Sequence, residues 1–168
     1  PLFIGKLSGK SGALSYGYLL GYDENTPYII PKEEGSKPLF TTKNAINNTI
    51  RAKYELAKGT YVGFLGTDRR TSGGSNTVGT MDTKIRINDT YTLSGIISSS
   101  STEESNDSLL NGSTQTFESF GDRHTYEFDN EQFKGIATRV TLDRTARHWG
   151  FFAWFNDRSP GFRTEQGF

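Results

Sequence analysis

The sequence predicts an all-β fold, an antiparallel up-and-down transmembrane β-barrel with one barrel domain or barrel segment over residues 1–168. Three observations support this prediction. Polar and apolar side chains alternate with a period of two residues, short and long links alternate along the chain, and one row of side chains carries no charge. No stretch has the periodicity of a helix.

The composition limits the classes of function. Lys plus Arg and Asp plus Glu are 19 each, so no overall charge indicates nucleic acid or anionic lipid as a partner. The chain has no cysteine, which excludes disulfides and thiolate metal sites. No run reaches the roughly 18 apolar residues of a transmembrane helix, but membrane-spanning strands need only about ten alternating residues.

Eight segments of the chain alternate in this way. Between the fifth and the sixth, Asn88-Asp89 is typical of a tight hairpin turn. The predicted strands are Phe3–Lys10, Ala13–Tyr22, Asn48–Leu56, Thr60–Thr67, Thr77–Ile87, Thr90–Ser98, Phe133–Asp143 and His148–Asn156.

The links between these segments predict the topology. Within each successive pair the link is short, whereas the links Asp23–Asn47, Asp68–Asn76 and Ser99–Glu131 are long. If strands run up and down, every long link lies at the same end of the sheet. Outer-membrane barrels have this layout, with tight periplasmic turns and long outer loops.

Two rows of side chains predict which face meets lipid. The uncharged row is Leu14, Tyr16, Tyr18, Leu20, Tyr22, Ile50, Ala52, Tyr54, Leu56, Met81, Thr83, Ile85, Ile87, Tyr91, Leu93, Gly95, Ile97, Ile136, Thr138, Val140, Leu142, Trp149, Phe151, Ala153 and Phe155. The opposite row carries Arg51, Lys53, Glu55, Asp82, Lys84, Arg86, Arg139 and Asp143, which we expect to face the lumen. Tyr22, Tyr91 and Trp149 fall at segment ends, where interfacial aromatics belong.

A soluble fold is the alternative. A two-sheet sandwich or a soluble antiparallel barrel could bury the uncharged row and bind a ligand or partner through its long loops. An eight-stranded barrel lumen, however, is just wide enough for its side chains, and this row holds many aromatics. The lumen-facing row can be interpreted as an ion-pair network, or as five cations against three anions that favour passage of anions.

Four stretches resemble a family of bacterial outer-membrane proteins of unassigned function, whose members join a domain like a family 9 carbohydrate-binding module to a large C-terminal barrel. These stretches are "IGKLSGKSG", "YVGFLGTDRR", "NTVGTMDTKIRINDTYTLSG" and "SPGFRTEQGF". The resemblance implies a barrel that continues beyond this chain. No carbohydrate-binding module is present here, so a role in sugar binding is not implied.

No motif predicts catalysis, a metal or another cofactor. His124, in or beside a long loop, and His148, at a tight turn, are not expected to be catalytic. The carboxylate pairs have no ion-binding spacing; the pairs are Glu33 with Glu34, Glu103 with Glu104, and Asp129 with Glu131. "GTDRRTSGGSN" and "GKLSGKSG" are Gly-rich but precede no helix, as a phosphate-binding loop requires.

The sequence therefore predicts a non-enzymatic outer-membrane barrel segment for solute passage or membrane structure. Its partners are lipid and further strands of the same or another chain, because we expect Phe3–Lys10 and His148–Asn156 not to pair with each other. Residues 157–168, "DRSPGFRTEQGF", are expected to form an outer loop that turns into another strand.

Overall fold

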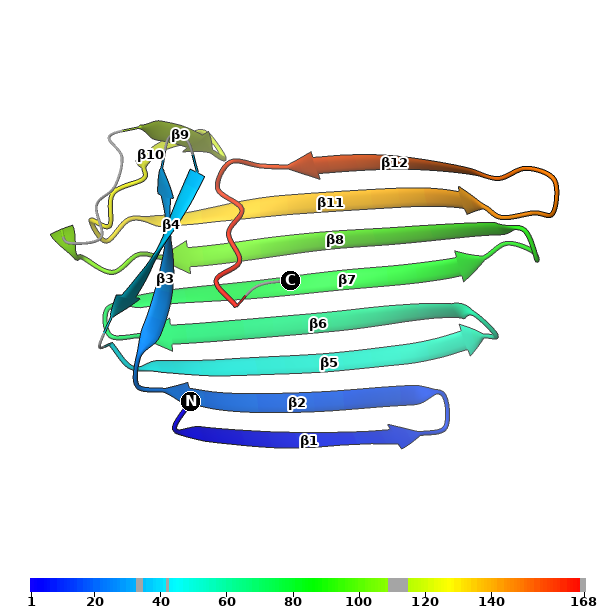
Figure 1. Cartoon of the computed structure of the whole chain (residues 1–168), viewed down its shortest axis with the longest axis horizontal. Coiled ribbons are helices and arrows are strands. Elements are labelled where there is room, and N and C mark those ends of the chain that lie inside the picture. Colours follow the sequence, from blue (N-terminus) through cyan, green and yellow to red (C-terminus); the bar gives the residue numbers. More distant parts are fainter. Residues whose placement is uncertain (33–34, 42, 109–114, 167–168) are drawn as a thin grey trace.

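A computed structural model describes residues 1–32, 35–41, 43–108 and 115–166. Eight strands form one antiparallel sheet in the order β1-β2-β5-β6-β7-β8-β11-β12 (Figure 1). Their bounds are β1 Phe3–Ser11, β2 Leu14–Asp23, β5 Ala45–Ala57, β6 Thr60–Thr71, β7 Gly74–Arg86, β8 Tyr91–Glu103, β11 Gln132–Arg144 and β12 Phe151–Arg158. The predicted all-β, up-and-down architecture is confirmed.

The sheet is open. β1 and β12 lie at its opposite edges and do not pair with each other, as expected from the sequence. The described part of the chain therefore does not form the closed barrel of the predicted fold class by itself. Within that part, no helix has the length and hydrophobicity needed to cross a bilayer.

The prediction of a long link at Asp68–Asn76 is wrong. β6 continues to Thr71 and β7 starts at Gly74, so the two strands meet at a tight turn in which Gly73 has a φ of 89°. The polar residues that suggested a loop form strand because Arg69 and Asn76 are buried and hydrogen-bonded by residues from another part of the chain. Only two of the three predicted long links are therefore long.

Those two long links contain strands that the sequence did not indicate. The first forms a hairpin of β3 Thr26–Lys32 and β4 Gly35–Thr41, and the second contains a hairpin of β9 Thr116–Ser119 and β10 Asp122–Thr125. β8 also extends past its predicted end, and β12 starts at Phe151 instead of His148. Both links leave the same end of the sheet, which we call the loop end; the opposite end is the turn end (Figure 1).

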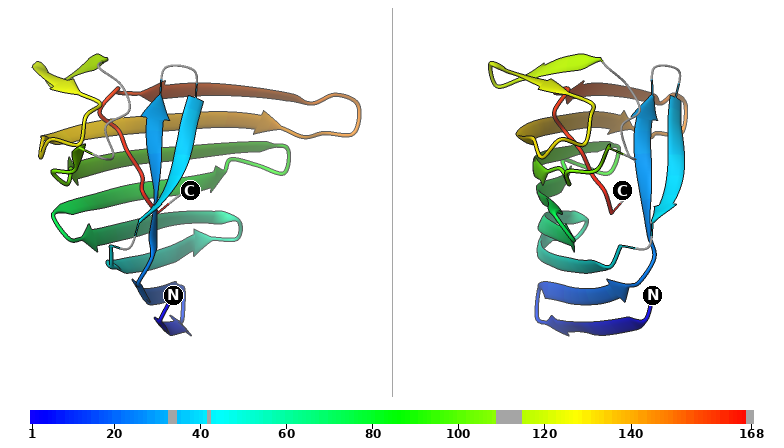
Figure 2. Two further views of the ribbon diagram at one scale, coloured as in Figure 1. Left: turned by 60° about the vertical axis from the view of Figure 1, so that its left-hand side comes forward. Right: turned by 90° about the vertical axis from the view of Figure 1, so that its left-hand side faces the viewer.

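The sheet is curved, and its edges turn toward the side on which the β3–β4 hairpin and the C-terminal segment, residues 159–166, lie (Figure 2). We call this side the concave face and the other the convex face. The expectation that the C-terminal segment forms an outer loop leading into a strand is wrong. After a turn at Pro160-Gly161 the segment crosses the concave face without regular structure.

The buried core lies at the loop end of the concave face. Ala45, Val78 and Phe133 come from the sheet, while Phe117 comes from β9 and Phe162 from the C-terminal segment. The C-terminal segment thus lies over the loop half of this face, and the β9–β10 hairpin packs against the loop end of β11. The described residues leave the turn half of the concave face open.

Candidate functional site

The strand register places the charged row on a single face. Side chains at paired positions of neighbouring antiparallel strands point to the same side of a sheet. Lys53 pairs with Gly63, Gly63 with Asp82, Asp82 with Ile96, and Ile96 with Arg139. The same registers bring the rest of the predicted row, Arg51, Glu55, Lys84, Arg86 and Asp143, to the concave face.

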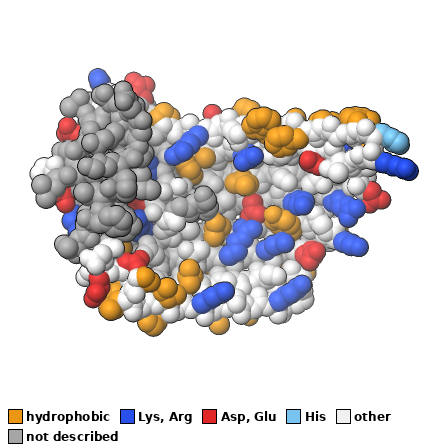
Figure 3. Space-filling model, in the orientation of Figure 1, with side chains coloured by type: hydrophobic (Ala, Val, Ile, Leu, Met, Phe, Trp, Pro, Cys, Tyr) orange, Lys and Arg blue, Asp and Glu red, His pale blue; other side chains and the backbone are white. Residues whose placement is uncertain are grey.

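Part of this row is internally paired. Arg51 and Asp82 form a double hydrogen bond, with Arg51 Nη2 2.8 Å from Asp82 Oδ2, and Lys53 Nζ lies 4.2 Å from the centre of the Tyr61 ring. Arg86 pairs with Asp89 at 2.8 Å in the adjacent turn. Among the described residues, Lys84 and Arg139 have neither an ion pair nor a side-chain hydrogen bond. Lys and Arg side chains are spread over the open half of this face (Figure 3).

The convex face is apolar, and no described part of the chain covers it. Paired positions place the predicted uncharged row on this face, except Leu56, Ile87 and Trp149, which have no register partner. Phe3, Leu7, Val62 and Phe64 of neighbouring strands lie on the same face. Its exposed large apolar side chains are Phe3, Leu7, Leu14, Tyr16, Tyr18, Ile46, Ile50, Tyr54, Val62, Phe64, Met81, Ile85, Ile97, Ile136, Val140, Phe151 and Phe155. Charged residues reach this face near its loop and turn ends, as at Asp68, Lys134 and Arg144.

An aromatic cluster marks the turn end of the apolar band. Phe151 packs against Tyr91 and Trp149 with ring centres 6.3 Å and 6.0 Å apart, and the Arg144 guanidinium lies 3.4 Å from the Trp149 ring centre. Tyr91 accepts a hydrogen bond from Arg144 Nε at 3.1 Å. The third predicted interfacial aromatic, Tyr22, lies near the loop end of the band, paired with Phe3 and Ile46.

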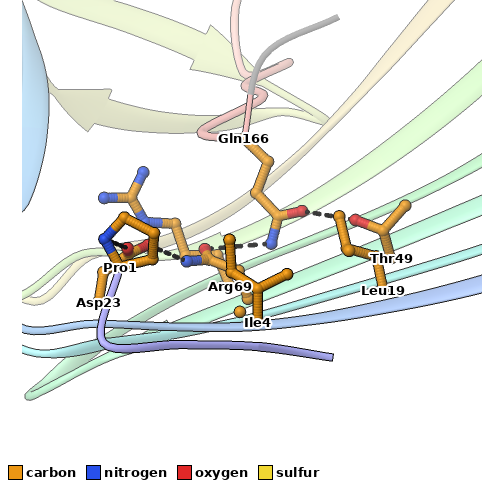
Figure 4. A pocket seen from close by; sticks show the side chains of 9 residues that line it. Pro1, Ile4, Leu19, Asp23, Thr49, Arg69 and Gln166 are labelled. Carbon is orange, nitrogen blue, oxygen red and sulfur yellow. Dashed lines mark hydrogen bonds and ion pairs between the residues drawn. The ribbon is translucent and has the colours of Figure 1, made fainter. Parts of the chain in front are cut away.

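The C-terminal segment is hydrogen-bonded to the concave face along its length. Gln166 Nε2 donates to Asp68 O at 2.9 Å. The Gln166 side-chain oxygen also accepts a hydrogen bond from Thr49 Oγ1 (Figure 4). Asn76 is 1% exposed; it donates to Arg163 O and accepts from Glu165 N. These contacts join strands in the first half of the chain to its last residues.

Arg163 anchors the segment at the loop end. Its Nη1 donates to Glu104 Oε1, and its guanidinium lies 4.6 Å from the ring centre of Phe133 and 5.6 Å from those of Phe117 and Tyr126. The Glu104 side chain is only 1% exposed, and its Oε2 has no hydrogen-bond partner among the residues that the structure describes. Removing a carboxylate from water disfavours its charged form, so burial raises the pKa of Glu104 to about 7 although Arg163 opposes the shift.

We expect the free energy of unfolding to fall as the pH rises from about 4.5 to about 7, because of Glu104. Native Glu104 keeps its proton up to about pH 7, whereas the unfolded chain releases it near its ordinary value of 4.5. Between these pH values the native state therefore binds more protons than the unfolded state. This difference stabilises the native state by roughly 3 kcal/mol below pH 4.5, and that stabilisation is lost above pH 7. Urea unfolding at several pH values measures this slope.

Glu104→Gln provides the test of this pH dependence, because the amide imitates the protonated acid at every pH. The variant should match the wild type near pH 4.5 and exceed its stability above pH 7. Glu103→Gln, which changes an exposed neighbour, is the matched control. Parallel pH profiles for the wild type and Glu104→Gln would contradict the assignment to Glu104.

Two cavities lined by described residues lie on the concave face beside the C-terminal segment. One of about 370 Å³ is bordered by Leu19, Thr49, Arg69 and Gln166 near the start of the chain (Figure 4). The other, of about 510 Å³, extends from Arg51 on β5 to Arg158 on β12 and reaches Phe162. Both have the size of small-molecule sites.

The structure brings together three carboxylates that the sequence considered in separate pairs. The nearest side-chain oxygens of Glu104, Asp129 and Glu131 all lie within 4.8 Å of one another. Arg163 already pairs with Glu104, and His124 Nδ1 lies 3.4 Å from Glu131 Oε2. The contacts with Arg163 and His124 thus hold the three carboxylates within the packed loop end of the sheet.

The structure also places the two histidines and the two Gly-rich stretches considered from the sequence. The His124 ring lies 5.4 Å from the Phe117 ring and belongs to the packed aromatic group, while His148 is exposed in the β11–β12 turn. "GTDRRTSGGSN" forms the ends of β6 and β7 with their turn, and "GKLSGKSG" lies in β1 and the next turn, so neither is a phosphate-binding loop. Glu33 and Glu34 lie outside the described residues.

No family model, curated protein or solved structure matches this chain. The geometry therefore carries the functional argument. The most important residues that the sequence did not indicate are those joining the C-terminal segment to the sheet, above all Arg163 and Gly135. The turn signal Pro160-Gly161 was the available sign that the chain reverses there.

Proposed function

We propose that this chain forms part of the wall of an outer-membrane β-barrel, with its convex face toward lipid and its concave face toward an aqueous lumen that solutes cross. The observation that carries the proposal is the uncovered apolar band of the convex face, which spans all eight strands of the sheet. A water-soluble sheet normally buries such a face against a second layer, and large exposed apolar patches mark interaction or membrane surfaces.

The dimensions and borders of the band support a membrane position. Along β8 it runs from Tyr91 to Ile97, about 20 Å at the rise of an antiparallel strand, close to the roughly 25 Å band of outer-membrane barrels. The cluster of Tyr91, Trp149 and Arg144 at its turn end has the composition of a membrane interface, where aromatic rings and long cationic side chains reach the headgroups.

The open edges support the participation of further strands. The outer edges of β1 and β12 have no strand partner in the described part of the chain. In hydrocarbon each unsatisfied backbone group costs several kcal/mol, so these edges require additional strands from the same or another chain. The proposed barrel is therefore larger than this sheet.

We expect the protein to need detergent or lipid to remain monodisperse. Without either, the apolar convex face would associate between molecules, and size-exclusion chromatography would show large aggregates. The same measurement in neutral detergent micelles should give a single species. A monodisperse protein in plain buffer would contradict the membrane proposal and favour a soluble sheet that binds through its loops.

A further inference from the structure

The larger cavity combines cationic and apolar groups on the open part of the concave face. Its volume is about 510 Å³, and its floor is formed by side chains of β6, β7, β8, β11 and β12. The C-terminal segment borders it through Phe162, which is 8% exposed. The cavity therefore has a wall at its loop-end side and is open on the other side.

Three arginines border this cavity, and they differ in their partners. Arg51 is bound by the Asp82 carboxylate, and Arg158 Nη2 donates to Phe162 O at 3.0 Å. Arg139 has no ion pair or side-chain hydrogen bond with any described residue, and it is exposed to the cavity's solvent. Because a guanidinium offers five donors in a fork that matches a carboxylate, Arg139 is the free anion-binding group of the cavity.

Apolar side chains lie beside this arginine. Ile96, directly opposite Arg139 in the strand register, is 43% exposed, and Leu65 lies in the cavity floor. Asn156, opposite Arg139 on β12, adds an amide at the same level. An inorganic anion would use Arg139 but leave the apolar surface of Ile96 and Leu65 in water.

From this arrangement we infer that the cavity binds small organic carboxylates. The carboxylate pairs with Arg139, and the apolar body of the ligand lies on Ile96 and Leu65 toward Phe162. Small organic carboxylates are then the class of solute that enters the proposed lumen. The inference rests on the proposed function in this respect, because the solute reaches the cavity through that lumen. The site itself requires only the fold of the concave face.

The test is calorimetric titration of the protein in neutral detergent micelles with phenylpropanoate as the probe. We expect saturable binding, and binding about tenfold or more weaker for the neutral phenylpropanamide and for acetate, which lack the charge and the apolar body respectively. Arg139→Gln should weaken phenylpropanoate binding by a similar factor. Lys84→Gln is the matched control, because Lys84 is an unpaired cation of the same face outside the cavity lining.

Several results would overturn the inference. Unchanged binding in Arg139→Gln, or equal loss in Lys84→Gln, would show that the cavity arginine provides no specific site. Equal affinity for acetate and phenylpropanoate would show that Ile96 and Leu65 do not form an apolar subsite. If binding follows these expectations but the protein is monodisperse without detergent, the binding site is supported and the membrane proposal is contradicted. If the protein needs detergent but does not bind phenylpropanoate, the membrane proposal is supported and the binding site is contradicted.

Discussion

Val140→Arg is expected to block assembly into a membrane. Val140 lies on the convex face within the apolar band, 40% exposed and opposite Gly95 and Phe155 in the register. An arginine near the bilayer midplane of a barrel costs about 2–4 kcal/mol, which lowers the assembled population by roughly 30- to 1000-fold. The measurement is the fraction of protein recovered in lipid vesicles and protected from protease.

Thr141→Arg is the matched control for this prediction. Thr141 is the next residue of β11, and its register partners Ser94 and Trp154 place it on the concave face. The same new charge then lies on the face that we propose lines the lumen, where water solvates it, so assembly should be close to that of the wild type. Equal recovery of both variants, or a greater loss for Thr141→Arg, would refute the assignment of faces.

Gly135→Ala should release the C-terminal segment from the sheet. Gly135 is a β11 residue on the concave face, and a Cβ atom there would overlap the backbone of Gly161 and Phe162. Overpacking a buried contact costs about 1–3 kcal/mol, so the segment should detach roughly 10- to 100-fold more often. Limited trypsin digestion measures this, because Arg158 directly precedes the segment and Arg163 lies in its middle.

Gly79→Ala tests whether the effect is specific to the contact. Gly79 also lies within a strand of the same sheet, and a Cβ atom there meets no other atom within 4 Å. Its cleavage pattern should match that of the wild type. Equally rapid cleavage in both variants, or none in Gly135→Ala, would contradict direct packing of the segment on β11.

Much of the sheet was predictable because its cause is local. In a strand, successive side chains point to opposite faces, so rows such as Thr138, Val140 and Leu142 can be read directly from the order of residues. Short polar links force neighbouring strands to pair, and this predicts the antiparallel order from β1 to β12. The common face of the charged row followed from these two facts, and the strand registers confirm it.

Strand ends were less predictable where polar residues continue the sheet. "RRTSGGSN" has the composition of a loop, yet it forms the ends of β6 and β7 because the C-terminal segment covers them. The Ser-rich end of β8 likewise continues as strand, with Ser98, Ser100 and Thr102 buried. Local propensity cannot indicate such strands, because their polar groups are satisfied by residues far away in the sequence.

By itself, then, the sequence determined the all-β class, the up-and-down order of the eight sheet strands and the separation of charged from uncharged side chains, because each arises from a two-residue period and short links. Only the tertiary structure decided that residues 159–166 fold back over the sheet, burying Glu104 beside Arg163 and forming one wall of the cavity next to Arg139. Contacts such as that between Thr49 and Gln166 join residues 117 positions apart, and the packing that selects them has no local pattern.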